Sequence, residues 1–491
     1  MRRALSLGFV CWVGWLNSCL GAGAEVSLKP LFATVDLNRG DELEVALPNG
    51  ETARVELLGL RESRGQVWGE VYRAEADVRV NGEAATLVSG MYRLPTQVGG
   101  VRIDCPITGG LKNNSHIDHW ALEKDARLRI WPGDSPAIRA GTFGYPVRQK
   151  WFASQTSFSN EPVAPRPARR LYYHAGLDIG GCEHLVDVIA ATDALVVSLG
   201  DRILPGHEKD TPIEKRYDVI YLMDARGWYY RYSHLASFDA GVKLGGRVKL
   251  GQRLGNIGKE GGSGGWTHLH FEIKARQPSG RWGTQEGYAF LWESYLARHK
   301  PDLIAVARPG HVVFAGQSVT LDGGKSWSRE GRIAKYEWTF SEGGTAVGPR
   351  VVRRYDNPGT YFETLKVTDA KGRVDYDFVR VRVFDRKAPN DQPPRLHATY
   401  FPTFDLRPGQ PITFKVRSFY NTHGEEIWNF GDGSPEVRVK SDGNVEQRAK
   451  DGYAVTTHTF EKPGDYLVRV RRSNEKGQPS EDRLHVRIEA R

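Results

Sequence analysis

Cysteine and methionine are scarce in this chain of 491 residues, which contains four cysteines and three methionines. Two of the cysteines, Cys11 and Cys19, lie in an N-terminal targeting segment. Only Cys105 and Cys182 remain after it, so the mature chain can form one disulfide at most, in an oxidising compartment. Two buried free thiols are the alternative. Cys182 as a metal ligand is a third interpretation, but a lone cysteine has no spacing signature.

Long apolar stretches are also missing beyond the start of the chain. No later segment reaches the roughly 20 apolar residues needed to span a membrane. At the start, two arginines precede an apolar run that closes on Ala22-Gly23-Ala24, a pattern typical of a secretory signal peptide cleaved after residue 24. A lipoprotein signal that uses Cys19 is the alternative. We therefore expect an exported, soluble protein that is secreted or resides in the periplasm or cell envelope.

Positive charge exceeds negative charge without forming a block. The net charge of +9 falls to +7 without residues 1–24, because these contain two arginines and no acidic residue. The excess supports solubility, or attraction to an anionic polymer such as a bacterial cell wall. A nucleic-acid partner is not expected, because no nucleic-acid motif accompanies the charge and the chain is exported.

Short runs rich in Val, Tyr, Phe and Thr, together with 55 glycines, favour a mainly β fold, and the length requires several domains. We expect a β-rich N-terminal module of unknown role, a β-rich domain that carries histidine motifs, and two tandem immunoglobulin-like β-sandwiches. The expected boundaries are 1–24 for the signal peptide, 25–140 for the module, 141–300 for the histidine-bearing domain, and 301–386 and 392–491 for the sandwiches.

Alternating apolar and polar residues predict half-buried strands in the N-terminal module, at residues 42–47 and 76–80, with a hairpin turn at Asn81-Gly82.

A histidine pair in the same module, His116 and His119 with Asp118 between them, invites interpretation as a metal cluster. A solvated loop is the preferred interpretation, because nothing around these residues fixes a geometry.

The most informative stretch is a glycine-rich loop, residues 261–265, that leads into His268-Leu269-His270. The residues that follow are strand formers, so we expect a strand entered from a flexible loop. Side chains two apart share one face of a strand, which puts both imidazoles on one side and Leu269 in the core. Two imidazoles on a rigid strand form half of a metal site or a catalytic pair.

His174, Asp178 and His234 can supply what the paired histidines lack. Glycines between and after His174 and Asp178 argue against a helix, so a strand and a tight turn are expected there. His234 ends the second strand of a predicted hairpin. A catalytic zinc has three protein ligands, and the remaining histidines would handle protons and stabilise an oxyanion. The inventory suits zinc-assisted amide hydrolysis, although spacing alone does not decide which histidine takes which role.

Three motifs, centred on residues 174–178, 232–235 and 268–272, resemble lysostaphin-type zinc endopeptidases in content and order. A glycine-rich stretch at 248–258 looks like the strand–turn–strand of that family, and the resemblance covers residues 141–300. It implies an antiparallel β-sheet with a groove for an extended peptide, and peptidoglycan cross-bridges or stem peptides as substrates. It implies one zinc ion per chain. The zinc ligands implied are His174, Asp178 and His270; the catalytic histidines implied are His234 and His268.

The sequence departs from that family pattern at two places. Thr267 stands where the family often has proline, and the loop at 180–185 contains Cys182, Glu183 and His184. Neither departure touches the five key positions, but both affect the expected groove and hence the substrate specificity.

The C-terminal third resembles two PKD-type domains in tandem, through short regular strands and motifs such as Trp428-Asn429-Phe430-Gly431-Asp432-Gly433. Trp338 and Trp428 are predicted core tryptophans rather than sugar-stacking platforms. Asp432 is predicted as a turn residue rather than a calcium ligand. The resemblance implies spacing, or adhesion to a polymer or protein partner.

The sequence thus predicts a secreted zinc metalloendopeptidase that cuts peptidoglycan peptides with a metal-activated water. An endopeptidase acting on an extracellular protein is the first alternative. A non-catalytic exported scaffold or activator is the second.

Overall fold

The computed structural model describes residues 28–163 and 170–490. The expected signal peptide and the alternative lipid anchor at Cys19 lie outside the described residues. Strands account for 47% of the described residues and helices for 4%, which confirms the mainly β prediction. Within the described part of the chain, neither helix is long and apolar enough to cross a membrane.

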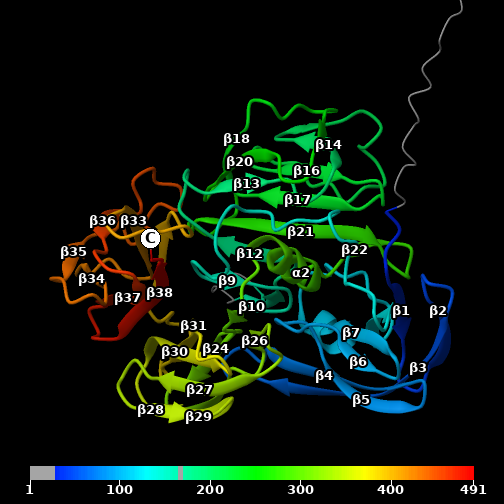
Figure 1. Cartoon of the computed structure of the whole chain (residues 1–491), viewed down its shortest axis with the longest axis horizontal. Helices are drawn as coiled ribbons and strands as arrows, with labels where there is room; N and C mark the ends of the chain where they lie inside the picture. The colour runs from blue at the N-terminus through cyan, green and yellow to red at the C-terminus, as the bar shows by residue number, and fades with distance from the viewer. Residues whose placement is uncertain (1–27, 164–169, 491) are drawn as a thin grey trace, which may run out of the picture.

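The N-terminal module, residues 28–140, is built from two small sheets (Figure 1, blue to cyan). Its elements are β1 Ala33–Leu37, β2 Glu42–Ala46, β3 Thr52–Arg64, β4 Val71–Val80, β5 Glu83–Val88, β6 Thr96–Val98, β7 Val101–Thr108, α1 Gly109–Asn114 and β8 Ala126–Pro132. The strand orders are β1-β8-β7-β6 and β2-β3-β4-β5. Both predicted strands are present, in β2 and β4. Asn81 and Gly82 have φ of 49° and 89°, as a tight hairpin turn requires.

The central domain, residues 141–300, has one large antiparallel sheet, a smaller one, and a two-stranded sheet that pairs residues 162–163 with 172–173. Its elements are β9 Thr156–Ser157, β10 Pro162–Val163, β11 Tyr172–Tyr173, β12 Leu177–Gly180, β13 Asp187–Ile189, β14 Ala194–Leu199, β15 Arg202–Ile203, β16 Ile220–Met223, β17 Tyr229–Ser233, β18 Leu235–Phe238, β19 Arg247–Val248, β20 Arg253–Ile257, β21 His268–Arg276, β22 Trp282–Thr284 and α2 Tyr288–His299. The large sheet runs β15-β14-β16-β17-β21-β12-β9, with β19 on β14 and β22 on β21; the smaller sheet runs β13-β20-β18. The long strand β21 therefore lies between β17 and β12, near the middle of the molecule (Figure 1).

The first sandwich, residues 301–386, and the second sandwich, residues 392–490, follow. The first contains β23 Leu303–Ile304, β24 His311–Phe314, β25 Gln317–Asp322, β26 Trp327–Ser328, β27 Ile333–Thr339, β28 Thr345–Val347, β29 Arg350–Tyr355, β30 Gly359–Asp369 and β31 Val374–Phe384. The second contains β32 Arg395–Phe401, β33 Pro411–Phe419, β34 Glu426–Asn429, β35 Val437–Val439, β36 Ala454–Thr459, β37 Gly464–Ser473 and β38 Pro479–Ile488. A parallel bridge between Thr360 and Ser480 joins them into one sheet, β24-β31-β30-β38-β37-β34-β35.

Each sandwich has a tryptophan at its centre, Trp338 and Trp428, and both are 0% exposed. They are core residues, as expected. Asp432 lies in a turn, where its carboxylate accepts hydrogen bonds from the backbone and hydroxyl of Ser434 and lies 2.7 Å from His458 Nε2. These local bonds account for the aspartate without a calcium ion.

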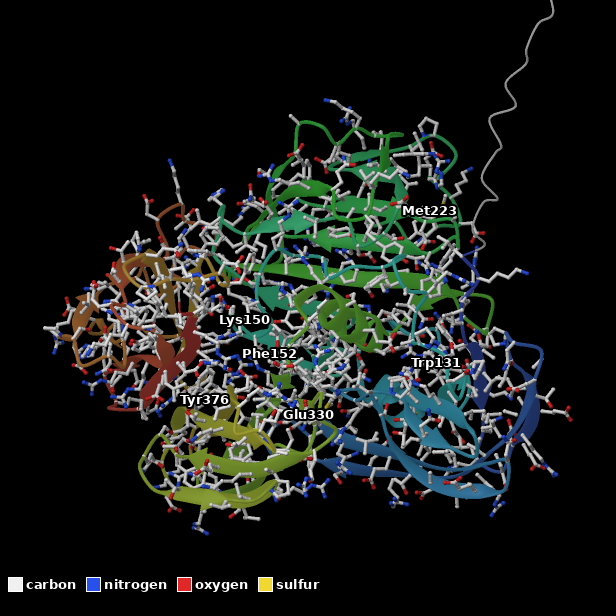
Figure 2. The ribbon with its side chains drawn as sticks, in the orientation of Figure 1. Trp131, Lys150, Phe152, Met223, Glu330 and Tyr376 are labelled. Atoms are coloured by element: carbon white, nitrogen blue, oxygen red, sulfur yellow. The ribbon has the colours of Figure 1, made fainter. Side chains whose placement is uncertain are left out.

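The central domain is in direct contact with both sandwiches. Figure 2 shows Lys150 and Phe152 at this junction, near the middle of the molecule. The backbone N–H of Lys150 donates to Thr403 Oγ1 of the second sandwich at 2.8 Å. The Arg308 guanidinium of the first sandwich lies 4.3 Å from the centre of the Phe152 ring. These buried contacts fix the sandwiches against the domain that carries the histidine motifs.

Cys105 and Cys182 are both free and buried, so the disulfide interpretation is wrong for this structure and the free-thiol alternative holds. Burial raises the thiol pKa of each to about 12. Cys182 packs 3.8 Å from Thr399 Oγ1 of the second sandwich rather than beside the histidine motifs.

Candidate active site and metal centre

The candidate site is built on two paired strands of the large sheet. Strands β12 and β21 are antiparallel, with Asp178 opposite His270 and Gly180 opposite His268. His268 and His270 point to the same side, because an imidazole nitrogen of each approaches Asp178 Oδ1, at 3.5 and 2.9 Å. Leu269 faces the other side and is 0% exposed. The strand alternation therefore gives the arrangement that the sequence predicts.

His174 reaches the same point from the turn before β12. Gly176, in that turn, has φ of 78°, and a Cβ there would lie 2.5 Å from the Phe271 carbonyl oxygen. Only glycine fits this close approach of the turn to β21. The result is a strand and a tight turn rather than a helix, in agreement with the sequence analysis.

Three donor atoms converge where these elements meet. His174 Nε2 lies 3.0 Å from Asp178 Oδ1, His270 Nδ1 lies 2.9 Å from the same oxygen, and the two nitrogens are 3.2 Å apart. In a tetrahedral zinc site with bonds near 2.0–2.1 Å, ligand atoms are separated by about 3.3 Å. The donor types and their separations therefore fit a zinc ion, and these three residues form a group of potential metal ligands among the described residues.

The electrostatics of this cluster also suit a cation. Burial alone would raise the pKa of Asp178, but His174 and His268 beside it hold that pKa well below its usual range. The carboxylate is thus ionised at neutral pH in a nearly solvent-free position. A buried carboxylate of this kind is stable when paired with positive charge or bound to a metal.

His234 and His268 flank the three donor atoms, and their ring centroids are 4.6 Å apart. His234 Nδ1 lies 2.7 Å from the Glu260 carbonyl oxygen, and His268 Nδ1 lies 3.1 Å from the Trp266 carbonyl oxygen. A carbonyl only accepts, so these contacts favour the tautomer with the proton on Nδ1 and an unprotonated Nε2; at His234 the Arg216 guanidinium also lies 3.2 Å from Nδ1. Burial lowers the pKa of both rings, that of His268 to about 3, which favours the neutral form.

Asp218 fixes the backbone of His234 and was not anticipated from the sequence. Its carboxylate accepts a hydrogen bond from the His234 backbone N–H at 2.9 Å, and His234 has a left-handed φ of 68°. In the β16–β17 hairpin Ile220 pairs with Tyr232, so Asp218 comes opposite His234 when that register is extended. The signal was therefore present, because the sequence predicts the same hairpin.

Glu272 is a second carboxylate that the sequence analysis did not use. It lies two residues after His270 on the same face of β21, and its Oε2 is 3.9 Å from His270 Nε2. Its Oε1 accepts hydrogen bonds from Thr284 at 2.8 Å and Lys274 at 2.6 Å. With Nδ1 of His270 directed to the donor triangle, Glu272 faces the opposite nitrogen of the ring. Carboxylates in this position orient metal-binding histidines.

The loop that contains His116 and His119 lies beside the central domain. His116 and Asp118 are exposed, as a solvated loop predicts, and neither histidine belongs to the donor cluster. His119 is an exception: its carbonyl oxygen accepts a hydrogen bond from the Thr284 backbone N–H, and burial lowers the pKa of its ring to about 4. The solvated-loop interpretation is therefore wrong for His119, because packing of the module against β22 covers it.

Thr267 forms hydrogen bonds with its backbone N–H and its hydroxyl, two groups that a proline at this position would lack. Its backbone N–H donates to Tyr453 Oη of the second sandwich at 3.0 Å, and its hydroxyl donates to the Gly181 carbonyl oxygen at 2.6 Å. In the other departing loop, Glu183 forms a buried ion pair with Lys259. The residues at both places where the sequence departs from the family pattern therefore form buried contacts around the site.

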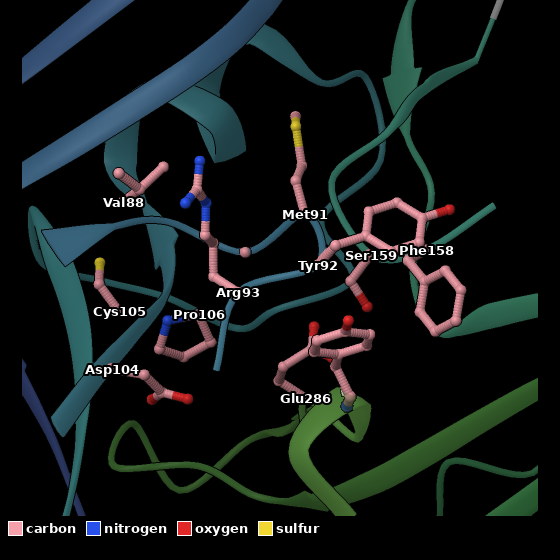
Figure 3. Close-up of a pocket in the computed structure, with 12 residues that line it drawn as sticks. Val88, Met91, Tyr92, Arg93, Asp104, Cys105, Pro106, Phe158, Ser159 and Glu286 are labelled. Carbon is pink, nitrogen blue, oxygen red and sulfur yellow. Dashed lines mark hydrogen bonds between the residues drawn. The ribbon is translucent and has the colours of Figure 1, made fainter. Parts of the chain in front are cut away.

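A pocket between the N-terminal module and the central domain lies apart from the donor cluster. Figure 3 shows Arg93, Asp104 and Cys105 from the module and Glu286 from the central domain around it. Its volume of about 10 Å³ is no larger than one water needs. It does not accommodate a peptide.

The sequence profile of peptidase family M23 matches residues 172–280, the segment that contains all five histidine-motif residues described above. Residues 172–280 form a peptidase family M23 domain. PKD domain profiles match residues 300–383 and 402–486, so two PKD domains follow the M23 domain. The chain therefore carries a metallopeptidase-type hydrolase domain.

Several known proteins are similar to parts of this chain. The catalytic domain of the antimicrobial peptidase lysostaphin from Staphylococcus simulans is 22% identical, with 28% of this chain and 92% of that chain covered and a TM-score of 0.21. The catalytic domain of the prophage-encoded M23 protein EnpA from Enterococcus faecalis is 18% identical, with 31% and 93% covered and a TM-score of 0.19. Collagenase ColA of Clostridium perfringens is 28% identical over 83 residues, which are 17% of this chain and only 8% of the collagenase.

Proposed function

We propose that this protein is an exported zinc-dependent endopeptidase that hydrolyses peptide bonds in peptidoglycan cross-bridges or stem peptides. The observation that supports it most strongly is the convergence of three donor atoms, from His174, Asp178 and His270, within 2.9–3.2 Å of one another in the M23 domain. The two PKD domains would space or anchor the M23 domain on a polymer or a protein partner.

In this proposal His174, Asp178 and His270 hold one zinc ion. Zinc in such a site supplies a Lewis acid for the substrate carbonyl and lowers the pKa of a coordinated water. His268 and His234 act on the substrate side, because the Nε2 atom of each is free of the proton that its Nδ1 donates to a carbonyl. Nε2 of His268 accepts the proton of the attacking water.

The same histidines can complete the reaction. An imidazole that has accepted a proton at Nε2 becomes a donor, and it can pass that proton to the leaving amine. His234 is held by Asp218 and the Glu260 carbonyl, and its Nε2 would stabilise the oxyanion once it has taken up a proton from solvent. The roles of the two histidines are thus complementary, and neither requires a serine or cysteine nucleophile.

A cell-wall substrate is supported by the M23 domain, by the net positive charge and by the similarity to the catalytic domain of an antimicrobial peptidase. An extracellular protein substrate is the second candidate, favoured by the short match to a collagenase. The two candidates share the metal chemistry and differ in what the groove accepts.

Gel zymography with purified peptidoglycan tests the proposal. We expect a clearing band for the zinc-loaded wild type, loss of the band with a chelator, and its return when zinc is added. His270→Ala should give no band. The matched control is His207→Ala, because His207 lies in the same domain but contacts Tyr229 rather than the donor cluster.

Three outcomes separate the alternatives. Cleavage of gelatin or collagen but not of peptidoglycan would favour the protein-substrate candidate. Equal clearing by His270→Ala and wild type would contradict the metal-site assignment. No cleavage of any peptide by the zinc-loaded wild type would favour a non-catalytic scaffold or activator.

A further inference from the structure

The loop that leads into β21 is held from outside the M23 domain. Asn444 Nδ2 of the second sandwich donates to the Gly264 carbonyl oxygen at 3.1 Å, and Arg417 Nη1 donates to the Gly265 carbonyl oxygen at 2.6 Å. Gly265 has φ of 89°, and a Cβ there would lie 2.0 Å from Asn444 Oδ1. The sandwich and the loop are thus in contact at Gly265, where any larger residue would displace the Asn444 side chain.

Arg417 is a fixed point of this contact rather than a mobile surface group. Its side chain is 0% exposed and forms a bidentate ion pair with Asp442. Its remaining three N–H groups donate to the carbonyl oxygens of Gly265, Glu446 and Gln447. All five N–H donors of the guanidinium therefore have an acceptor, and one of these acceptors belongs to the loop of the M23 domain.

A chain of hydrogen bonds joins the same loop to the interior of the sandwich. The Thr267 backbone N–H donates to Tyr453 Oη at 3.0 Å, and Tyr453 Oη lies 2.8 Å from His397 Nδ1. Because Ser154 Oγ donates to a backbone carbonyl, it accepts from His397 Nε2–H at 2.8 Å; burial lowers the pKa of His397 and keeps the ring neutral, so its Nδ1 accepts from the Tyr453 hydroxyl. Ser154 in turn donates to the Ala398 carbonyl oxygen at 3.1 Å. Every donor in this buried chain has one acceptor.

The held loop touches His268 directly. Trp266 stacks on the His268 ring, with centroids 3.9 Å apart and planes 15° apart, and its carbonyl oxygen accepts the Nδ1 proton of the same ring. The indole also contacts the second sandwich, where the His397 ring lies at a steep angle to it with centroids 5.1 Å apart and the Arg395 guanidinium lies 5.8 Å from its centre. Trp266 therefore contacts both His268 and the sandwich.

We infer that the second PKD domain is part of the active centre: Tyr453, Arg417 and Asn444 are positioning residues that act through the 264–267 loop on His268. The inference deepens the proposed function and rests on it for its kinetic consequence. A PKD domain that only spaced or anchored the enzyme would not need three hydrogen bonds to the backbone of the loop before β21. In this proposal the domain holds the loop that positions His268.

Tyr453→Phe tests the inference, because it keeps the ring and removes only the hydroxyl that accepts from Thr267. The matched control is Tyr400→Phe in the same sandwich, where the lost bond runs to the His485 carbonyl oxygen and not to the loop. Asn444→Gly is a second variant that removes the bond to Gly264. Glycine tolerates the left-handed φ of 60° at this position without strain.

Hydrogen exchange read by mass spectrometry should show amides of residues 261–268 exchanging about tenfold faster in Tyr453→Phe and Asn444→Gly than in Tyr400→Phe and wild type. Peptidoglycan hydrolysis should show kcat about tenfold lower in Tyr453→Phe, with KM within about twofold, because a small displacement of a reacting group lowers the rate without weakening binding. Zinc content should stay at one ion per chain, since no ligand is altered.

Unchanged exchange at residues 261–268 in both variants would overturn the inference. A looser loop with unchanged kcat, or a change confined to KM, would also overturn it. If the wild type cuts no peptidoglycan, the proposed function fails. The exchange experiment still decides whether the second sandwich holds the loop.

Discussion

Glu272 provides the most specific prediction about the metal centre, because it touches a ligand without being one. Its carboxylate is buried on β21, and burial alone would raise its pKa. Lys274 and His270 outweigh burial and hold the Glu272 pKa well below its usual range. The carboxylate is therefore ionised at neutral pH and faces Nε2 of the His270 ring, the nitrogen directed away from the donor cluster. We predict that Glu272→Gln weakens zinc binding while leaving the three ligands in place.

The size of the effect follows from distance and charge. Two unit charges 3.9 Å apart, the separation of Glu272 Oε2 and His270 Nε2, attract by about 4 kcal/mol at an effective dielectric constant of 20. Only part of a metal's charge reaches the distal nitrogen of the ring, and outer carboxylates typically change metal affinity by about 10–100-fold. We expect that range, about 1.4–2.8 kcal/mol. Lys274, left without its partner, adds repulsion in the same direction.

Competition with a chromophoric chelator measures the zinc Kd of each variant. The matched control is Glu293→Gln on α2, a carboxylate that accepts from the Ala137 backbone N–H and does not contact the donor cluster. Its zinc Kd should equal that of the wild type. A zinc Kd for Glu272→Gln within twofold of the wild-type value would show that Glu272 does not support zinc binding, as would an equal loss of affinity in the control.

Three further predictions concern the histidines, the core and the interface. His268→Ala and His234→Ala should each keep one zinc ion per chain by elemental analysis but lose about 10²–10⁴-fold in kcat; loss of zinc from either would instead make that residue a ligand. Leu269→Ala should lower the free energy of unfolding by about 2–5 kcal/mol in denaturant titrations, because its side chain is 0% exposed; a change below 1 kcal/mol would contradict the packing. Burial raises the pKa of Asp482 to about 6, so between about pH 4 and 6 the folded state retains a proton that the unfolded state has released, and this group lowers stability as the pH rises. Asp482→Asn should remove that part of the decline in chemical unfolding at several pH values, and an unchanged pH profile would contradict the assignment.

Local sequence patterns predicted the elements of the site but not what surrounds them. The alternation of His268, Leu269 and His270 sets their faces because the side-chain period of a strand is two residues. The glycines near Asp178 indicate a turn because Gly176 adopts a left-handed φ. Such short-range rules also account for the β2 strand and the β4–β5 hairpin.

The contacts that the sequence did not disclose join residues far apart in the chain. Thr267 and Tyr453 are 186 residues apart, and Ser154 and His397 are 243 apart. No periodicity links such pairs, because they depend on how whole domains dock. The same holds for His119, which a local view places in solvent and which packs against β22 of the central domain. The position of the second sandwich beside the loop was likewise not predictable from its own motifs.

Mass spectrometry of the muropeptides that the protein releases from purified cell walls shows whether it cuts peptide bonds there and which one. We expect new fragments with free termini at one type of peptide bond, produced by the zinc-loaded wild type and absent with His270→Ala or a chelator. Release of the same fragments by His270→Ala, or of glycan fragments with intact peptides, would contradict the proposed function.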